Sequence, residues 1–227
     1  MDIRVVHQAA VRGRRADENR QTLRQAGVFT ANFIGTAGCG KTTLIGETVG
    51  RLIPVFHMGV IACDPEKVRD ASRMADRCDQ IVQVDTGEGQ LLEASDIQEA
   101  LRSLDLGRLE MLLIENISSI VGPAEVDLGE DAKVAVFSVT EGDDKADKYA
   151  DVVGRADAVI LNKLDLADDV TFNLDVFRSD VRRLNPGAAL FEMSLLKGQG
   201  MERWLHWLMV RSNKRPENLG HISHWFG

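Results

Sequence analysis

A glycine-rich run in the first quarter of the chain places a lysine and a threonine directly after a glycine. From Gly35 to Thr42 the spacing is G-x-x-x-x-G-K-T. Glycines at such positions let backbone N–H groups approach phosphate oxygens, the Lys41 ammonium can reach the β and γ oxygens, and the Thr42 hydroxyl can bind Mg²⁺. The residues predicted to contact the phosphates of a nucleotide are Gly35, Gly38, Cys39, Gly40, Lys41, Thr42 and Thr43.

The sequence around this run favours a phosphate site over the alternative, an ordinary glycine-rich turn. An apolar, strand-like stretch precedes Gly35, and a helical pattern follows Lys41. The positive N-terminal end of that helix would face a bound anion. From average composition, a chance match to the spacing in a chain of this length has a probability on the order of one in a hundred. The run therefore predicts a P-loop.

A second polar run, N-K-L-D at residues 162–165, follows the apolar stretch "AVIL". Guanine presents N1–H and its exocyclic amine side by side, and the Asp165 carboxylate can accept from both, whereas adenine would leave it unsatisfied. Asn162 could contact the guanine edge or brace the loop, and the Lys163 stem could cover the ring. We expect Ser194 and Leu195, after the next strand, to support the base. A polar strand-to-helix turn is the alternative.

Two acidic residues follow apolar strands and are candidates for the Mg²⁺ site. Glu115 ends the stretch "MLLIE", where a carboxylate could hold Mg²⁺ directly or through water, next to Thr42. Asp64 ends the second strand and could serve the metal or the attacking water, although "DPEK" also suits a helix N-cap. We expect Lys41, Thr42, Asp64 and Glu115 to carry catalysis. Because we find no obvious catalytic glutamine or arginine finger, we expect slow turnover until a second subunit or partner completes the site.

Composition limits the classes of protein to which the chain could belong. Its 227 residues, 44% hydrophobic and 27% charged, suit one compact domain. The net charge of −8 disfavours general affinity for nucleic-acid phosphates. No apolar run approaches the ~20 residues of a membrane span, and the N-terminus lacks the apolar core of a signal peptide. The chain has three cysteines, and this small, odd number fits reduced thiols better than a disulfide framework. We expect a cytoplasmic protein that binds neither nucleic acid nor membrane.

Apolar strand-like runs alternate with helical patterns along the chain. Continuous apolar strands indicate burial on both faces, and the alternation indicates a mainly parallel sheet. We predict an α/β fold, a P-loop NTPase whose central sheet of about seven strands is flanked by helices. The expected strands are Val28–Gly35, Val55–Cys63, Ile81–Val84, Met111–Glu115, Val134–Val139, Ala158–Asn162 and Leu190–Ser194. A helical extension over 1–27, a GTPase domain over 28–211 and a tail over 212–227 complete the prediction, with a leading helix over Ala16–Gln25 that ends at Gly27.

Several longer blocks resemble one family of GTPases. They are "ADENRQTL", "NFIGTAGCGKTTL", "CDPEKVRDASRM", "DTGEGQLLEA", "IENISSIVGPAEVDLGE", "VAVFSVTEGDDKADKY", "ILNKLDL" and "GMERWLHWL". Together they resemble the nickel-insertion GTPases of hydrogenase maturation, the HypB-like family, and more distantly their urease counterparts. The resemblance runs from about Ala16 to about Leu208.

The resemblance implies a P-loop GTPase that binds GTP or GDP with Mg²⁺, dimerises with GTP and helps to load a metal into an apo-enzyme. The implied partners are a second copy of the chain and an apo-metalloenzyme client, with a metallochaperone as a further candidate. Glu141, Asp144 and Lys145 would lie near the nucleotide and the dimer contact. The alternative for these three residues is a solvated charged loop.

The chain departs from the family where the family binds its metal. The resemblance implies a Cys-His pair and a further Cys, but the corresponding residues here are Gln90, Leu91 and Gly122. Leucine and glycine have no side-chain donor, and glutamine is a poor ligand for soft metals. Ser118 stands where the resemblance implies a glycine in the switch region. A backbone conformation with φ > 0 is costly for serine. We therefore expect no intrinsic nickel or zinc site in the domain.

The remaining cysteines and histidines offer no clear replacement for the missing ligands. Cys39, Cys63 and Cys78 are expected to be structural thiols. Only His221 and His224, in the tail, have a spacing that could hold a metal, and a partner-docking tail is the alternative.

Three functions stay open at this point. We favour a GTP-dependent maturation factor whose metal comes from a partner or whose client needs conformational help. The second is a true nickel-insertion GTPase with a non-standard metal site. The third is a nucleotide-switched scaffold for enzyme assembly. The sequence identifies neither the client nor the metal.

Overall fold

The computed structural model describes residues 8–63, 78–87 and 91–213, called the described residues below. Its strands are β1 (Phe29–Gly35), β2 (Met58–Ala62), β3 (Gln80–Gln83), β4 (Met111–Glu115), β5 (Ala132–Ser138), β6 (Ala158–Asn162) and β7 (Ala189–Glu192). Its α-helices are α1 (Gln8–Ala26), α2 (Lys41–Leu52), α4 (Ala94–Arg102), α5 (Val121–Glu125), α6 (Lys145–Lys148), α7 (Ala150–Arg155), α8 (Leu174–Leu184) and α9 (Met201–Arg211). The short 3₁₀ helices are η2 (Leu106–Arg108), η3 (Val139–Glu141) and η4 (Leu164–Asp169).

All seven strands form one parallel sheet in the order β3-β2-β4-β1-β5-β6-β7. Every residue of β1, β2, β4 and β6 is buried, as expected for strands covered on both faces. The predicted P-loop NTPase fold with a seven-stranded sheet is confirmed. Because β1 lies between β4 and β5, the ends of these three strands bring Gly35, Glu115 and Ser138 to the same edge of the sheet.

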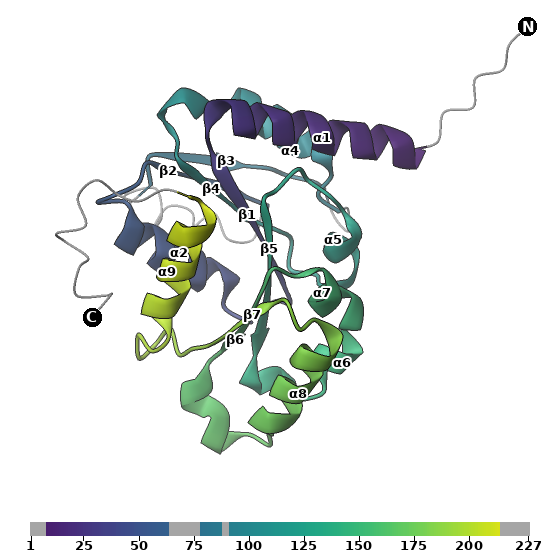
Figure 1. Cartoon of the computed structure of the whole chain (residues 1–227), viewed down its shortest axis with the longest axis vertical. Coiled ribbons are helices and arrows are strands. Elements are labelled where there is room, and N and C mark those ends of the chain that lie inside the picture. The colour runs from purple at the N-terminus through teal and green to yellow at the C-terminus, as the bar shows by residue number, and fades with distance from the viewer. Residues whose placement is uncertain (1–7, 64–77, 88–90, 214–227) are drawn as a thin grey trace, which may run out of the picture.

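Helices cover both faces of the sheet (Figure 1). α2 and α9 lie on one face, and α5, α6, α7 and α8 lie on the other. Trp204, a residue of α9, is fully buried. Its indole packs edge-on against Phe33 and donates to Thr48 Oγ1 at 2.9 Å. This packing fixes β1 against α2, the two elements that the phosphate loop connects.

The leading helix begins earlier than expected, at Gln8 rather than Ala16. It ends as expected before Gly27, whose φ of 70° suits a residue without a Cβ. α1 packs beside α4 (Figure 1), and Asn19 of α1 donates to the backbone oxygens of Ala94 and Leu128. The helix is thus part of the packed core, although the division into an extension, a domain and a tail stays a prediction.

Only β4 and β6 have both of their expected bounds, and the other five strands differ from the prediction by one to three residues at one or both ends. β2 starts at Met58 rather than Val55 because the N–H groups of Val55 and Phe56 both bond Leu52 O, so these residues belong to the turn that ends α2. β7 ends at Glu192, before Ser194, which pairs with Gln199 in an isolated bridge. No helix within the described residues has the length and apolar character that a membrane crossing requires.

Candidate nucleotide site

The predicted phosphate loop connects β1 to α2 and leaves no room for side chains at its ends. Gly38 and Gly40 have φ values of 79° and 104°. A methyl group at Gly35 would lie 2.5 Å from Val136 O and 2.8 Å from Cys39 Sγ. At Gly40 a methyl group would collide with Asn162 Nδ2. The loop therefore needs glycine both for its backbone conformation and for its close contact with β5 and the end of β6.

Lys41 lies inside this loop. Its side chain is 2% exposed, and its ammonium donates to Gly35 O at 2.6 Å and to Thr36 O at 3.2 Å. Two carbonyl dipoles only partly offset the loss of water around a buried cation. A phosphate group would add a charge-assisted hydrogen bond to this ammonium, so the position of Lys41 fits an anion-binding loop.

Thr42 and Glu115 meet where α2 begins and β4 ends. The Thr42 hydroxyl donates to Glu115 Oε1, and Glu115 is almost fully buried. A hydroxyl and a carboxylate are the hard oxygen donors that Mg²⁺ prefers. The pair fits the predicted Mg²⁺ site. Asp64, the other predicted ligand, lies outside the described residues.

The predicted guanine site lies beside the phosphate loop. The Asn162 side chain donates to Cys39 O at 3.0 Å and accepts from Leu195 N at 3.4 Å. Asn162 therefore braces the phosphate loop against the loop after β7, which was one of its two expected roles. The next residue, Lys163, has a φ of 62°, which is uncommon for a residue with a Cβ.

Asp165 and Ser194 are hydrogen-bonded to one another across this site. The Ser194 hydroxyl donates to Asp165 Oδ1 and accepts from Lys197 N at 3.2 Å. Ser194 therefore positions the carboxylate that would accept the guanine N–H groups. Among the described residues, Asn162 joins the phosphate loop to Leu195, and Ser194 holds Asp165. Thr43 occupies an exposed position in the first turn of α2.

Glu141 also reaches the phosphate loop, through a residue that the motif did not single out. Glu141 Oε1 accepts from the Thr36 hydroxyl, while Oε2 accepts from Ser138 N at 2.8 Å. Glu141 thus connects the phosphate loop to the segment after β5. Asp144 precedes α6, and the Lys145 ammonium lies 6.0 Å from the centre of the Tyr149 ring. The predicted dimer contact at these residues stays a prediction.

Comparison with known proteins identifies the family. The profile described as "CobW/HypB/UreG, nucleotide-binding domain" matches residues 29–192, which include the phosphate loop and the N-K-L-D run. The chain belongs to the CobW/HypB/UreG family. A hydrogenase maturation factor HypB of Rhizobium leguminosarum bv. viciae is 38% identical over 200 residues, covering 88% of this chain and 67% of that protein. A probable hydrogenase maturation factor HypB of Methanocaldococcus jannaschii is 35% identical over 195 residues, covering 86% and 88%.

Solved HypB structures share the fold of this CobW/HypB/UreG protein. HypB of Archaeoglobus fulgidus superimposes with a TM-score of 0.85 at 32% identity, covering 89% of this chain and 99% of that one. HypB of Helicobacter pylori in complex with nickel gives a TM-score of 0.83 at 31% identity, covering 89% and 95%.

Within this CobW/HypB/UreG chain, two of the positions expected to lack nickel ligands contact one another. A methyl group at Gly122 would lie 2.6 Å from Leu91 Cδ2 and 2.7 Å from Leu91 Cδ1. The apolar side chain of Leu91 therefore packs against Gly122, at two positions where the resemblance implies metal ligands. Gln90, His221 and His224 lie outside the described residues.

The thiols are poorly placed to replace the missing ligands. Cys39 and Cys63 are buried. Burial raises the pKa of the Cys78 thiol, which donates to Met58 O at 3.1 Å and Gln80 O at 3.3 Å. A raised pKa disfavours the thiolate that binds metal. Within the described residues, no cluster of three or more His, Cys, Asp or Glu residues could hold a metal ion.

Proposed function

We propose that this chain is a GTP-binding and GTP-hydrolysing accessory protein that assists assembly of the metal centre of a metalloenzyme. The maturation role is carried over from relatives named hydrogenase maturation factor HypB. The observation that supports guanine nucleotide as the ligand is the direct connection between the two loops of the site. Asn162 bonds the phosphate loop at Cys39 O, and Asp165 lies three residues later, held by Ser194.

Each side chain has a distinct proposed task in GTP hydrolysis. Lys41 neutralises charge on the β and γ phosphate oxygens, and Thr42 and Glu115 hold Mg²⁺. Bound Mg²⁺ would offset negative charge that develops on the phosphate oxygens. Asp165 accepts the two donors of guanine and thereby excludes adenine. We keep Asp64 as a candidate for the metal or the attacking water.

The proposed partners follow from the sequence motifs and from the relatives named as maturation factors. We propose a homodimer favoured by GTP, because no obvious catalytic glutamine or arginine finger was found in the chain. An apo-metalloenzyme client, a metallochaperone that supplies the metal and a cytoplasmic location are also proposals.

Delivery of nickel by this chain itself is the second candidate function. The HypB of Helicobacter pylori whose structure was solved with nickel favours it. The contact between Leu91 and Gly122 speaks against it, because neither side chain offers a metal ligand. We therefore favour a factor whose metal comes from a partner. A scaffold that hydrolyses GTP only incidentally is the third possibility, and stimulation of hydrolysis by a client would argue against it.

Replacing Glu115 with glutamine tests the proposed chemistry. We expect the rate constant of GTP hydrolysis on the enzyme to fall about 100-fold at fixed Mg²⁺, because an amide is a weaker ligand than a carboxylate. Single-turnover hydrolysis of radiolabelled GTP measures this rate.

The matched control is Glu110→Gln, just before the other end of β4. Glu110 Oε2 accepts from His57 N at 3.0 Å, far from the nucleotide site along the strand. Hydrolysis by Glu110→Gln should equal that of the parent chain. An unchanged rate in Glu115→Gln would show that Glu115 has no part in the reaction.

A further inference from the structure

A polar amide lies in the middle of the central strand. Asn32 of β1 is fully buried, in a strand whose seven residues are all buried. A buried amide is strongly unfavourable unless both its ends find partners. Both ends of Asn32 do. Its Nδ2 donates to Glu130 Oε1 at 3.1 Å, and its Oδ1 accepts from Asn116 Nδ2 at 3.1 Å.

Asn116 connects this amide to the proposed Mg²⁺ ligand. It follows Glu115 directly, is fully buried, and its backbone N–H donates to Phe33 O at 3.1 Å. Its side-chain oxygen accepts from Ile117 N at 2.9 Å. Asn116 therefore fixes how the chain leaves β4, and with it the backbone that carries the Glu115 carboxylate.

Glu130 and Lys133 connect Asn32 to the end of α5 and the segment after it. Lys133 pairs in register with Asn32, so both side chains project from the same face of the sheet. Glu130 Oε1 lies 3.4 Å from the Lys133 ammonium, and the two side chains are only 3% and 17% exposed. The ammonium donates to Ala124 O at 3.0 Å and Val126 O at 2.7 Å.

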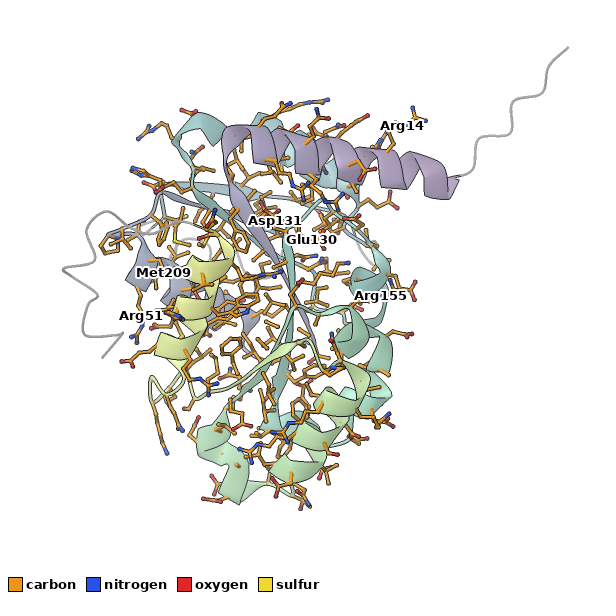
Figure 2. All side chains as sticks on the ribbon, viewed as in Figure 1. Arg14, Arg51, Glu130, Asp131, Arg155 and Met209 are labelled. Carbon is orange, nitrogen blue, oxygen red and sulfur yellow. The ribbon has the colours of Figure 1, made fainter. Side chains whose placement is uncertain are left out.

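The same segment is tied to α1. Glu130 Oε2 accepts from Leu128 N at 2.8 Å, and Leu128 O accepts from Asn19 Nδ2 at 3.0 Å. Figure 2 shows Glu130 beneath α1, next to Asp131. Hydrogen bonds therefore run from the residue after Glu115, through the core, to Leu128, and the Glu130–Lys133 ion pair extends the connection to Ala124 and Val126.

We propose that Asn32 is a positioning residue for GTP hydrolysis, which holds the Glu115 end of β4 at a fixed distance from residues 124–130. The inference rests on the proposed function, because it assigns Glu115 to Mg²⁺. Asn32 itself contacts neither metal nor nucleotide. It acts through Asn116 on one side and Glu130 on the other, so that a change at the Mg²⁺ site is transmitted to the segment after α5.

The test uses the full chain with Asn32→Leu, which keeps the number and branching of the side-chain heavy atoms but breaks both hydrogen bonds. Thr30→Val is the matched control. Thr30 is a fully buried residue on the same strand and face, and its hydroxyl has no hydrogen-bond partner within the described residues. Two readouts are measured for each variant: the Mg²⁺ concentration for half-maximal GTP hydrolysis, and amide hydrogen exchange over 117–130 with and without a non-hydrolysable GTP analogue and Mg²⁺.

In Asn32→Leu the Mg²⁺ requirement should rise about tenfold, as for loss of other residues that orient metal ligands. GDP affinity without Mg²⁺ should stay that of the parent, and the effect of the nucleotide on exchange over 117–130 should be lost. Thr30→Val should match the parent in each readout. A purely structural role would lower the melting temperature of Asn32→Leu but leave its Mg²⁺ requirement unchanged, and that result would overturn the proposal.

Asn116→Ala decides the question if Asn32→Leu does not fold, since it breaks the same connection next to Glu115. A Mg²⁺ requirement like that of the parent in Asn116→Ala would then overturn the proposal. Absence of Mg²⁺-dependent GTP hydrolysis in the parent chain would contradict the proposed function and the inference together. An altered requirement in Thr30→Val as large as that in Asn32→Leu would contradict the inference alone.

Discussion

Asp165→Asn should turn a guanine site into a xanthine site. A carboxylate accepts from both N1–H and the exocyclic amine of guanine, whereas an amide places a donor against one of them. GTP affinity should fall on the order of 100-fold, because the variant leaves a buried donor facing a donor. Xanthosine triphosphate should gain affinity, since its O2 accepts where the guanine amine donates. Competition against a fluorescent nucleotide measures both affinities.

The structure makes this substitution conservative for the loop itself. The Ser194 hydroxyl donates to Asp165 Oδ1, and the amide oxygen of asparagine can accept the same bond. Asp169→Asn, an exposed residue of the same 3₁₀ turn, is the matched control and should leave both affinities unchanged. Equal loss of GTP and xanthosine triphosphate binding in Asp165→Asn would mean that the residue supports the loop without contacting the base.

The second large effect concerns metal. The full chain carrying His221→Ala and His224→Ala should bind neither Ni²⁺ nor Zn²⁺ tightly, with or without GTP, because soft metals need thiolate or imidazole ligands. Adding Gln90→Cys, Leu91→His and Gly122→Cys should create tight binding where this parent has none. Calorimetric titration with each metal measures the change.

Packing explains why the restoring substitutions must be made together. Gly122→Cys alone would force its Cβ against the Leu91 methyl groups and should destabilise the fold by about 1–3 kcal/mol. Leu91→His removes the methyl groups that obstruct it. One tightly bound Ni²⁺ or Zn²⁺ per dimer before restoration would refute the account, and would mean that Cys39, Cys63 or Cys78 is a ligand.

Much of the candidate nucleotide site could be proposed from the sequence because its chemistry is local. The phosphate loop needs consecutive residues between one strand and one helix, so the spacing from Gly35 to Thr42 predicts both the loop and its neighbours. The position of Glu115 was predictable for a related reason, because parallel strands bring their carboxyl ends to the same edge of the sheet.

Contacts between distant segments could not be predicted in this way. The sequence left open whether Asn162 would contact the base or brace the loop, and its bond to Cys39 O depends on how β6 and the phosphate loop pack. The contact of Leu91 with Gly122 likewise joins the segment before α4 to α5. Asn32 was missed entirely, because a single polar residue in an apolar strand does not reveal its partners. The local apolar pattern also predicted that β2 begins at Val55. In the structure Val55 belongs to the turn that follows α2, because its N–H donates to Leu52 O.

Competition between GTP and ATP for the wild-type chain tests the central claim most directly, which is that Asp165 and the phosphate loop form one guanine-nucleotide site. A fluorescent GDP analogue is bound in the presence of Mg²⁺ and displaced by each unlabelled nucleotide in turn. GTP should displace it at concentrations at least about 100-fold lower than ATP, because adenine leaves the Asp165 carboxylate unsatisfied. Displacement by ATP and GTP at the same concentration would contradict the account.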